Sequence, residues 1–201
     1  MHYANCVVGD LNESGLLVSD QATVAMIDAD SFEVEASGRR FLCAVGKDDF
    51  TAPEFALDQL GKRERTRNHD AFGLAVLIFH LLFLGRSPFG GIGPKGDLEL
   101  RPAMEQHCFA FSLKRDTGVR PPPGTLTLAD LSPILAAQFE SAFAPVGRVG
   151  LRPRPTEWVD SLDRFERELI ACRRRPLHRF HPAAGQCSWC RIEAETGRDP
   201  F

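Results

Sequence analysis

The sequence predicts a mainly α-helical fold that begins with a small β-hairpin and ends in a short metal-binding tail. Three observations predict it. Two short apolar runs separated by turn-forming residues open the chain, helical apolar periodicity dominates its centre, and clustered cysteine and histidine residues close it. The chain has 201 residues, of which 43% are hydrophobic and 25% charged, as expected for one globular domain with a short appendage.

The overall composition argues against several classes of protein. The formal net charge of -3 gives no general attraction to nucleic acid or to acidic membranes, so we expect no nucleic-acid partner. No stretch reaches the ~18 apolar residues of a membrane span. The N-terminal sequence also lacks the order of charged, apolar and small residues that marks a signal peptide. We therefore expect a cytoplasmic protein that does not associate with membranes.

The β-hairpin is predicted from residues 16–18 and 24–27, two apolar runs joined by the turn-forming Ser19-Asp20-Gln21. Such a hairpin would bring Asp10 and Asp28 toward one end of the structure. The following segment, residues 29–67, has weak periodicity and is expected to be irregular.

Four helices are expected further along the chain. Residues 70–84 are apolar nearly all round, which predicts a central buried helix that ends at Gly85. Residues 98–106 form a modest helix candidate, and residues 128–143 form another. Residues 156–172 carry the clearest amphipathic pattern, with apolar side chains at helical spacing and charged ones opposite.

Two aspartates are candidates for phosphoryl-transfer chemistry. That reaction requires a carboxylate near the attacking hydroxyl and a second carboxylate on the metal that neutralises the phosphate charge. Asp10 and Asp28 each follow a short strand-like run, which would hold such a group rigidly. The structural alternative is that both simply cap turns.

Five motifs in sequence order resemble those of protein kinases. VGDLNESGLLV (8–18) is similar to the catalytic loop, IDADSF (27–32) to the D-F-G motif, and TAPEF (51–55) to the A-P-E motif. Residues 69–89 resemble the central helix of the C-terminal lobe, and LRPRPTEWVDSL (151–162) resembles the segment that opens its last helix. The chain is therefore similar to bacterial Ser/Thr protein-kinase-like proteins over almost its whole length.

The resemblance implies roles for individual residues. Asp10 corresponds to the catalytic aspartate, and Asn12 stands where many kinases have lysine. Asp28 corresponds to the carboxylate that binds Mg²⁺. Asp30 replaces the glycine of D-F-G, and either adds a metal ligand or points to solvent.

It also implies two structural contacts. Glu54 of the A-P-E motif would form an ion pair with Arg152, and Asp70 would accept hydrogen bonds from the catalytic-loop backbone. The implied fold is a protein-kinase-like C-lobe, residues 1–170, with a small β-hairpin at the catalytic loop. The implied reaction is transfer of the ATP γ-phosphate to Ser or Thr of a protein.

Several departures from the family pattern weaken the implied activity. Val8 and Gly9 replace the histidine and arginine of the catalytic loop, and Gly15 replaces the asparagine that holds a second metal ion. No glycine-rich loop or strand lysine precedes the catalytic loop, so we expect the N-lobe to be absent. Mg²⁺–ATP would bind only if an N-lobe were supplied, and the isolated chain should be inactive or very weak. The alternative is a non-catalytic pseudokinase module that binds a protein partner.

The tail, residues 171–201, contains the pattern C-x5-H-x8-C-x2-C formed by Cys172, His178, Cys187 and Cys190. Zinc takes four nitrogen or sulfur ligands, and a C-x2-C turn supplies two of them. The kinase-like proteins that this chain resembles carry a similar ending. We therefore expect a structural zinc knuckle, with His181 as an alternative fourth ligand. A disordered tail with stray thiols, or a disulfide, is the other interpretation.

Overall fold

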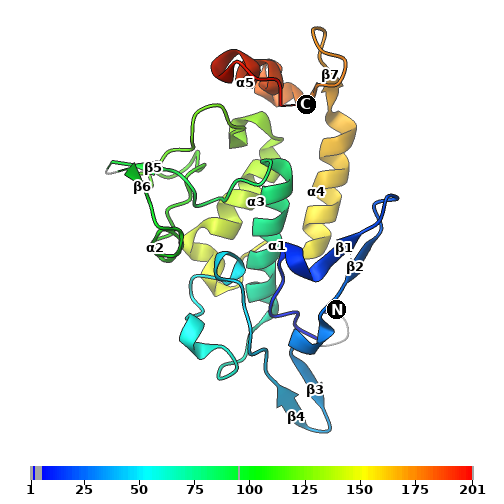
Figure 1. Cartoon of the computed structure of the whole chain (residues 1–201), viewed down its shortest axis with the longest axis vertical. Helices are drawn as coiled ribbons and strands as arrows, with labels where there is room; N and C mark the ends of the chain where they lie inside the picture. The colour runs from blue at the N-terminus through cyan, green and yellow to red at the C-terminus, as the bar shows by residue number, and fades with distance from the viewer. Residues whose placement is uncertain (1, 3–5, 95, 201) are drawn as a thin grey trace.

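The computed structural model describes residues 2, 6–94 and 96–200. Over these residues the protein is rich in helices and contains small two-stranded antiparallel sheets. Figure 1 shows helix α1 (Arg67–Leu82) running through the middle of the molecule with α3 (Pro133–Phe143) beside it and α4 (Pro155–Glu168) along one side. Among the described residues, no helix combines the length and apolarity that a bilayer-spanning segment requires.

Helix α1 is the central buried helix that the sequence predicts, although it occupies residues 67–82 rather than 70–84. It begins earlier because Thr66 caps it: the Thr66 backbone N–H donates to His69 Nδ1 over 2.8 Å. It ends earlier because Leu84 and Gly85 both have left-handed backbone angles, with φ of 54° and 80°.

The hydrophobic core is built around one phenylalanine of α1. Phe79 is fully buried and stacks on Phe83, with ring centroids 3.9 Å apart. The rings of Phe111 and Phe139 meet it edge-on at 4.9 and 5.2 Å. Aromatic side chains bury a large apolar area, and edge-to-face pairs add a further attraction. This cluster joins α1 to α3 and to the loop that precedes it.

The helix expected at residues 128–143 is divided in two. A short 3-10 turn, η6, covers Leu128–Asp130, and α3 starts anew at Pro133. Ser132 caps α3 by accepting a hydrogen bond from the Leu135 backbone N–H at 3.3 Å. A proline is favoured at the first helical position and a serine just before it, so these two residues fix the start.

The amphipathic helix expected at residues 156–172 ends at Glu168, the last residue of α4. The chain then leaves the helix because Ile170–Ala171 (β7) pairs antiparallel with Arg179–Phe180 (β8). The tail continues through a 3-10 turn, η8 (Pro182–Ala184), into α5 (Ser188–Thr196).

The hairpin at the start of the chain is formed as predicted. Strands β1 (Leu16–Val18) and β2 (Val24–Met26) are antiparallel, with Leu16 opposite Met26. The remaining short elements are η2 (Glu13–Gly15), η3 (Ala29–Ser31), η4 (Asp48–Phe50), η5 (Leu57–Gln59), β5 (Ile92–Gly93), β6 (Gly96–Asp97), α2 (Leu100–Glu105) and η7 (Pro145–Val149).

The prediction that residues 29–67 are irregular throughout is wrong at one place. Strands β3 (Val34–Ala36) and β4 (Arg39–Phe41) form a second hairpin. Its two-residue turn consists of Ser37 and Gly38, which have positive φ of 52° and 71°. Such a turn matches the twist of the paired strands, and the short strands carry too little apolar periodicity to be seen in the sequence.

The central position of Phe79 predicts a large cost for its truncation. Phe79→Ala should lower the free energy of unfolding by about 3–5 kcal/mol in urea denaturation, because it leaves a cavity in a closely packed cluster. Leu81→Ala on the same helix is the matched control, since that side chain is 73% exposed. Equal losses in the two variants would contradict this account of the core.

Candidate functional site

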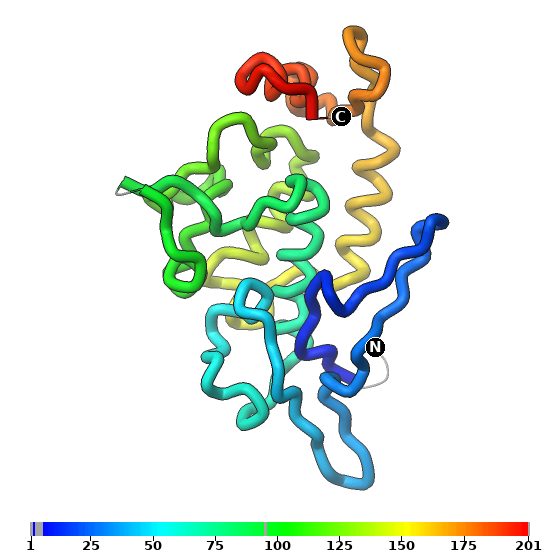
Figure 2. Tube along the Cα trace, viewed as in Figure 1, coloured from blue at the N-terminus to red at the C-terminus, as the bar shows by residue number. Residues whose placement is uncertain are grey.

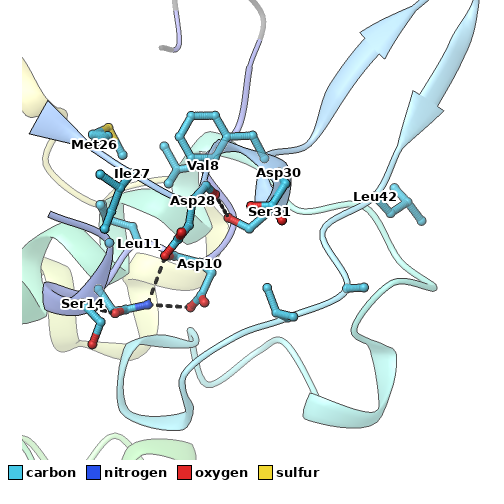
Figure 3. Close-up of a pocket in the computed structure, with 15 residues that line it drawn as sticks. Val8, Asp10, Leu11, Ser14, Met26, Ile27, Asp28, Asp30, Ser31 and Leu42 are labelled. Atoms are coloured by element: carbon cyan, nitrogen blue, oxygen red, sulfur yellow. Dashed lines mark hydrogen bonds between the residues drawn. The ribbon is translucent and has the colours of Figure 1, made fainter.

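A pocket of about 420 Å³ opens beside the β1–β2 hairpin and η3. Three carboxylates that the sequence singles out, those of Asp10, Asp28 and Asp30, line it together with Asn12. Figure 3 shows Asp10 and Asp28 on neighbouring walls of this pocket, one from the loop before β1 and the other from the turn after β2. The fold therefore brings the two aspartates into one site.

The Asp10 carboxylate is held by two donors. Asn12 Nδ2 donates to Asp10 Oδ1 over 2.9 Å, and the backbone N–H of Lys47 donates to the same oxygen over 3.0 Å. Asn12 is buried, and its own Oδ1 accepts a hydrogen bond from the Ser14 N–H at 2.9 Å. Asn12 therefore positions Asp10, and no hydrogen bond from the described residues reaches Asp10 Oδ2.

Asp28 occupies an unusual backbone conformation at the other wall of the pocket. Its φ of 58° and ψ of 44° lie in the left-handed region, which is uncommon for residues other than glycine and often marks a functional constraint. Its carbonyl accepts hydrogen bonds from the backbone N–H and the hydroxyl of Ser31, at 3.1 and 2.9 Å. The carboxylates of Asp28 and Asp30 are exposed to solvent.

Asp70 anchors the loop that carries Asp10. It lies in the first turn of α1, is only 3% exposed, and accepts hydrogen bonds from the Val8 and Gly9 N–H groups at 2.8 and 2.9 Å. His2 Nε2 also lies 2.8 Å from Asp70 Oδ2. The resemblance implies a contact between Asp70 and the backbone of this loop, and the structure contains such a contact.

Residue 9 is a glycine because the backbone angle and the neighbouring Cys43 leave no room for a side chain. Its φ is 76°, and a Cβ added there would lie 2.7 Å from the Cβ of Cys43. An arginine at this position, as in many kinases, could not be accommodated without moving the segment that contains Cys43.

Two buried charged residues near the pocket were not singled out by the sequence. Arg65 donates to the carbonyl oxygens of Gly9 and, at 2.8 Å, of Val45. Glu33 accepts the Arg65 backbone N–H at 3.0 Å and that of Cys43 at 3.4 Å. Burial raises the pKa of the Glu33 carboxyl, although these N–H groups act in the opposite direction. The sequence could not reveal them, because a segment without periodicity has no pattern that separates buried charged residues from exposed ones.

Glu54 and Arg152 form the ion pair that the resemblance implies. Arg152 Nη2 donates to Glu54 Oε2 over 2.8 Å, and Arg152 also donates to the carbonyls of Ala142 and Asn68 at 3.2 and 3.1 Å. Burial opposes ionisation of Glu54, but the hydrogen bonds and charge of Arg152 outweigh it and lower the pKa of the carboxyl. His69, which the sequence did not single out, lies 4.0 Å from Glu54.

The tail brings Cys172, His178, Cys187 and Cys190 together, and their ligand atoms all lie within 4.8 Å of one another. Cys172 Sγ is 3.6 Å from Cys190 Sγ, and His178 Nδ1 is 3.6 Å from the sulfurs of both Cys187 and Cys190. This cluster could hold a metal ion. Soft sulfur and imidazole donors at such spacing suit a tetrahedral ion.

Two alternatives considered for the tail are wrong. His181 is not a ligand, because its Nε2 is 3.0 Å from Glu168 Oε2 and its Nδ1 accepts the Ala183 N–H at 3.1 Å. A disulfide is also excluded, since all six cysteines of the chain are described and all are free thiols.

The thiols of the cluster differ in acidity. The backbone N–H of Arg174, 3.3 Å from the sulfur, stabilises the thiolate and lowers the pKa of Cys172 to about 7. Desolvation and the neighbouring sulfurs raise the pKa of Cys190 to about 12. A bound cation would reverse that repulsion, because it favours every thiolate around it.

Comparison with known proteins gives two similar relatives. No protein-family model matches the chain. Over 198 residues it is 37% identical to Protein kinase YegI of Escherichia coli O157:H7 and 36% identical to Protein kinase YegI of Escherichia coli strain K12. Each match covers 96% of this chain and 30% of the relative, so the chain spans about a third of the length of these curated proteins.

This similarity supports a protein-kinase-like family. The five ordered motifs, which lie between residues 8 and 162, resemble the same family.

The buried His69 predicts a pH dependence of stability. Burial lowers the pKa of the imidazole to about 4, although the Glu54 carboxylate acts in the opposite direction. The unfolded chain has a His pKa near ~6.5, so it takes up a proton before the folded protein does, and stability falls between about pH 6.5 and pH 4.

In wild type the loss from His69 should approach ~1.4 kcal/mol per pH unit at most. His69→Gln should be less stable than wild type above pH 6.5, and the difference should shrink toward pH 4. Urea unfolding at a series of pH values measures this, and parallel pH profiles for the two proteins would contradict it.

Proposed function

We propose that this chain is the C-terminal-lobe portion of a Ser/Thr protein-kinase-like protein. The observation that carries the proposal is that Asp10 and Asp28 line one pocket, and that the loop carrying Asp10 is held by the buried Asp70. The similarity to proteins named as protein kinases supports it. The reaction would be transfer of the ATP γ-phosphate to a Ser or Thr hydroxyl of a protein.

The two aspartates would divide the work as phosphoryl transfer requires. Asp10 Oδ2 would accept a hydrogen bond from the attacking hydroxyl, because Oδ1 is already engaged by Asn12 and Lys47. The exposed carboxylate of Asp28 would hold Mg²⁺, which prefers one or two carboxylates together with phosphate oxygens. Asp30, on the same pocket wall, is an additional candidate oxygen ligand.

The chain by itself should be inactive or very weak. Gly15, at the position of the second metal ligand, has no side chain with which to bind a metal. Val8 and Gly9 also stand where the family's catalytic loop has histidine and arginine, and positioning supplies most of the rate enhancement in this reaction. The same two features favour a second candidate, a non-catalytic pseudokinase module that binds a protein partner.

The tail cluster is proposed to bind zinc. Zn–S bonds of ~2.3 Å and Zn–N bonds of ~2.05 Å in a tetrahedron put ligand atoms about 3.5–3.8 Å apart. The separations of 3.6 Å between the Cys172 and Cys190 sulfurs, and between His178 Nδ1 and two of the sulfurs, match this. When bound, the ion would supply a structural cross-link.

Phosphotransfer by the purified chain tests the activity. With Mg²⁺–ATP and a generic protein substrate, we expect turnover no greater than that of Asp10→Asn, and no increase in melting temperature with Mg²⁺–ATP. Robust turnover that Asp10→Asn abolishes would show that the chain is an active kinase and would exclude the non-catalytic module.

Binding of Mn²⁺, a paramagnetic stand-in for Mg²⁺, tests the metal role of Asp28. Carboxylate sites that hold Mg²⁺ also accept Mn²⁺, so NMR signals of residues lining the pocket should broaden at millimolar Mn²⁺. Asp28→Asn should lessen the broadening several-fold, and the exposed Asp20→Asn should not. Equal broadening in both variants would remove Asp28 from the proposed site.

A further inference from the structure

The four ligands of the tail cluster come from separate segments. Cys172 directly follows β7, His178 directly precedes β8, and Cys187 and Cys190 lie at the start of α5. Strand β7 in turn continues from α4 by a single residue. An ion at this cluster would therefore fix α5 to the end of α4.

A different part of α5 contacts the lobe. Arg191 Nη2 donates to Asp130 Oδ2 of η6 over 2.8 Å, and to the Thr125 carbonyl over 3.2 Å. Ile192 is 6% exposed and belongs to the same hydrophobic core as α1 and α3. Figure 2 shows the tail lying across one end of the molecule, beside the segment around residues 125–130.

The approach of α5 to the lobe is close at Gly124. A Cβ added to this residue would lie only 2.2 Å from Cγ2 of Thr196, which is the last residue of α5. The φ of Gly124 is 68°, in the left-handed region that favours glycine. The absence of a side chain at Gly124 therefore leaves room for the end of α5 against the lobe.

The tail has little apolar material with which to hold itself together. Among the described residues after 170, Ile192 is the single hydrophobic side chain that is buried, and it packs against the lobe. A segment with so small a core needs another source of folding free energy, and a structural metal ion is a common one.

We propose that the Cys/His cluster is a metal-dependent clasp, in which ion binding and docking of α5 onto the kinase-like lobe are thermodynamically coupled. The ion orders α5, and α5 then covers the end of the core with Ile192 and ties η6 through the Arg191–Asp130 pair. This inference rests on metal binding by the tail and is independent of phosphoryl transfer.

Asp199 serves the clasp as a positioning residue. Its Oδ1 lies 3.1 Å from His178 Nε2, so the other ring nitrogen, Nδ1, faces the Cys187 and Cys190 sulfurs. Arg175 pairs with Glu193 of α5 and lies 3.8 Å from Asp199. Carboxylates that orient a ligating histidine strengthen metal binding, and here the orienting residue follows α5 in the chain.

The first test uses the 201-residue chain purified without chelator. We expect close to one equivalent of zinc, and we expect a strong chelator to lower the melting temperature by at least about 5 °C while increasing the binding of an apolar fluorescent dye. If the purified chain carries a full equivalent of zinc and its removal by the chelator leaves the melting temperature unchanged, the clasp is overturned but the metal site is kept. Absence of any bound metal would overturn both and leave the kinase-like assignment untouched.

The second test uses variants on the lobe that do not touch the ion. Because coupling is reciprocal, weakening the docking must weaken zinc binding by the same factor. Asp130→Asn and, independently, Gly124→Ala should raise the zinc dissociation constant about tenfold in a chelator competition assay, whereas Asp20→Asn on the β1–β2 turn should not. Unchanged zinc affinity in both lobe variants would overturn the clasp, even where one of them is poorly folded.

Discussion

The candidate site depends on one buried carboxylate, Asp70, in the first turn of the central helix. Its two oxygens accept the N–H groups of Val8 and Gly9, which fixes the loop that ends at Asp10. A helix N-terminus favours negative charge, and a buried carboxylate is tolerated only when it is hydrogen-bonded. Helix α1 is in turn held by the aromatic cluster around Phe79, so one helix connects the hydrophobic core to the loop that lines the pocket.

Close backbone approach completes this anchorage. Gly73, one turn along α1 from Asp70, would carry a Cβ only 2.9 Å from the Leu11 carbonyl, so any other residue would push the loop away. The loop therefore lies directly on the helix, and Asp10 leaves it toward the pocket. The combination of an acid at one helical position and a glycine three residues later sets the distance between helix α1 and the loop that carries Asp10.

Buried charged side chains connect the segments around the pocket. Arg65 and Glu33 are each engaged by backbone groups, and the Glu54–Arg152 pair joins the segment before α1 to the one before α4. These charged side chains give hydrogen-bond partners to backbone groups of irregular segments. Such segments lack the regular backbone pairing that satisfies these groups in helices and sheets. The tail, which has almost no core of its own, carries a Cys/His cluster that could hold a metal ion.

The chemical groups of the pocket and the scaffold around it differ in how closely they follow the kinase pattern. The contacts made by Asp70 and by Glu54 with Arg152 are those that the resemblance implies. The sequence departs from it at Val8 and Gly9 in the loop before Asp10, and at Gly15, the position of the second metal ligand. The structural contacts implied by the resemblance are thus present, whereas the residues near the proposed catalytic groups differ. This combination is the physical basis for proposing a kinase-like lobe with weak or absent activity.

The sequence alone determined the features that are encoded over a few residues: the buried helix α1, the β1–β2 hairpin, and the spacing of the four tail ligands. Only the tertiary structure decided which polar groups meet across long separations. It showed that Arg65 binds the Gly9 carbonyl, that His181 turns to Glu168 instead of the cluster, and that α5 docks on η6. Local periodicity reports which face of a segment is apolar, whereas a hydrogen bond between residues far apart in the chain depends on where the whole fold places their backbones.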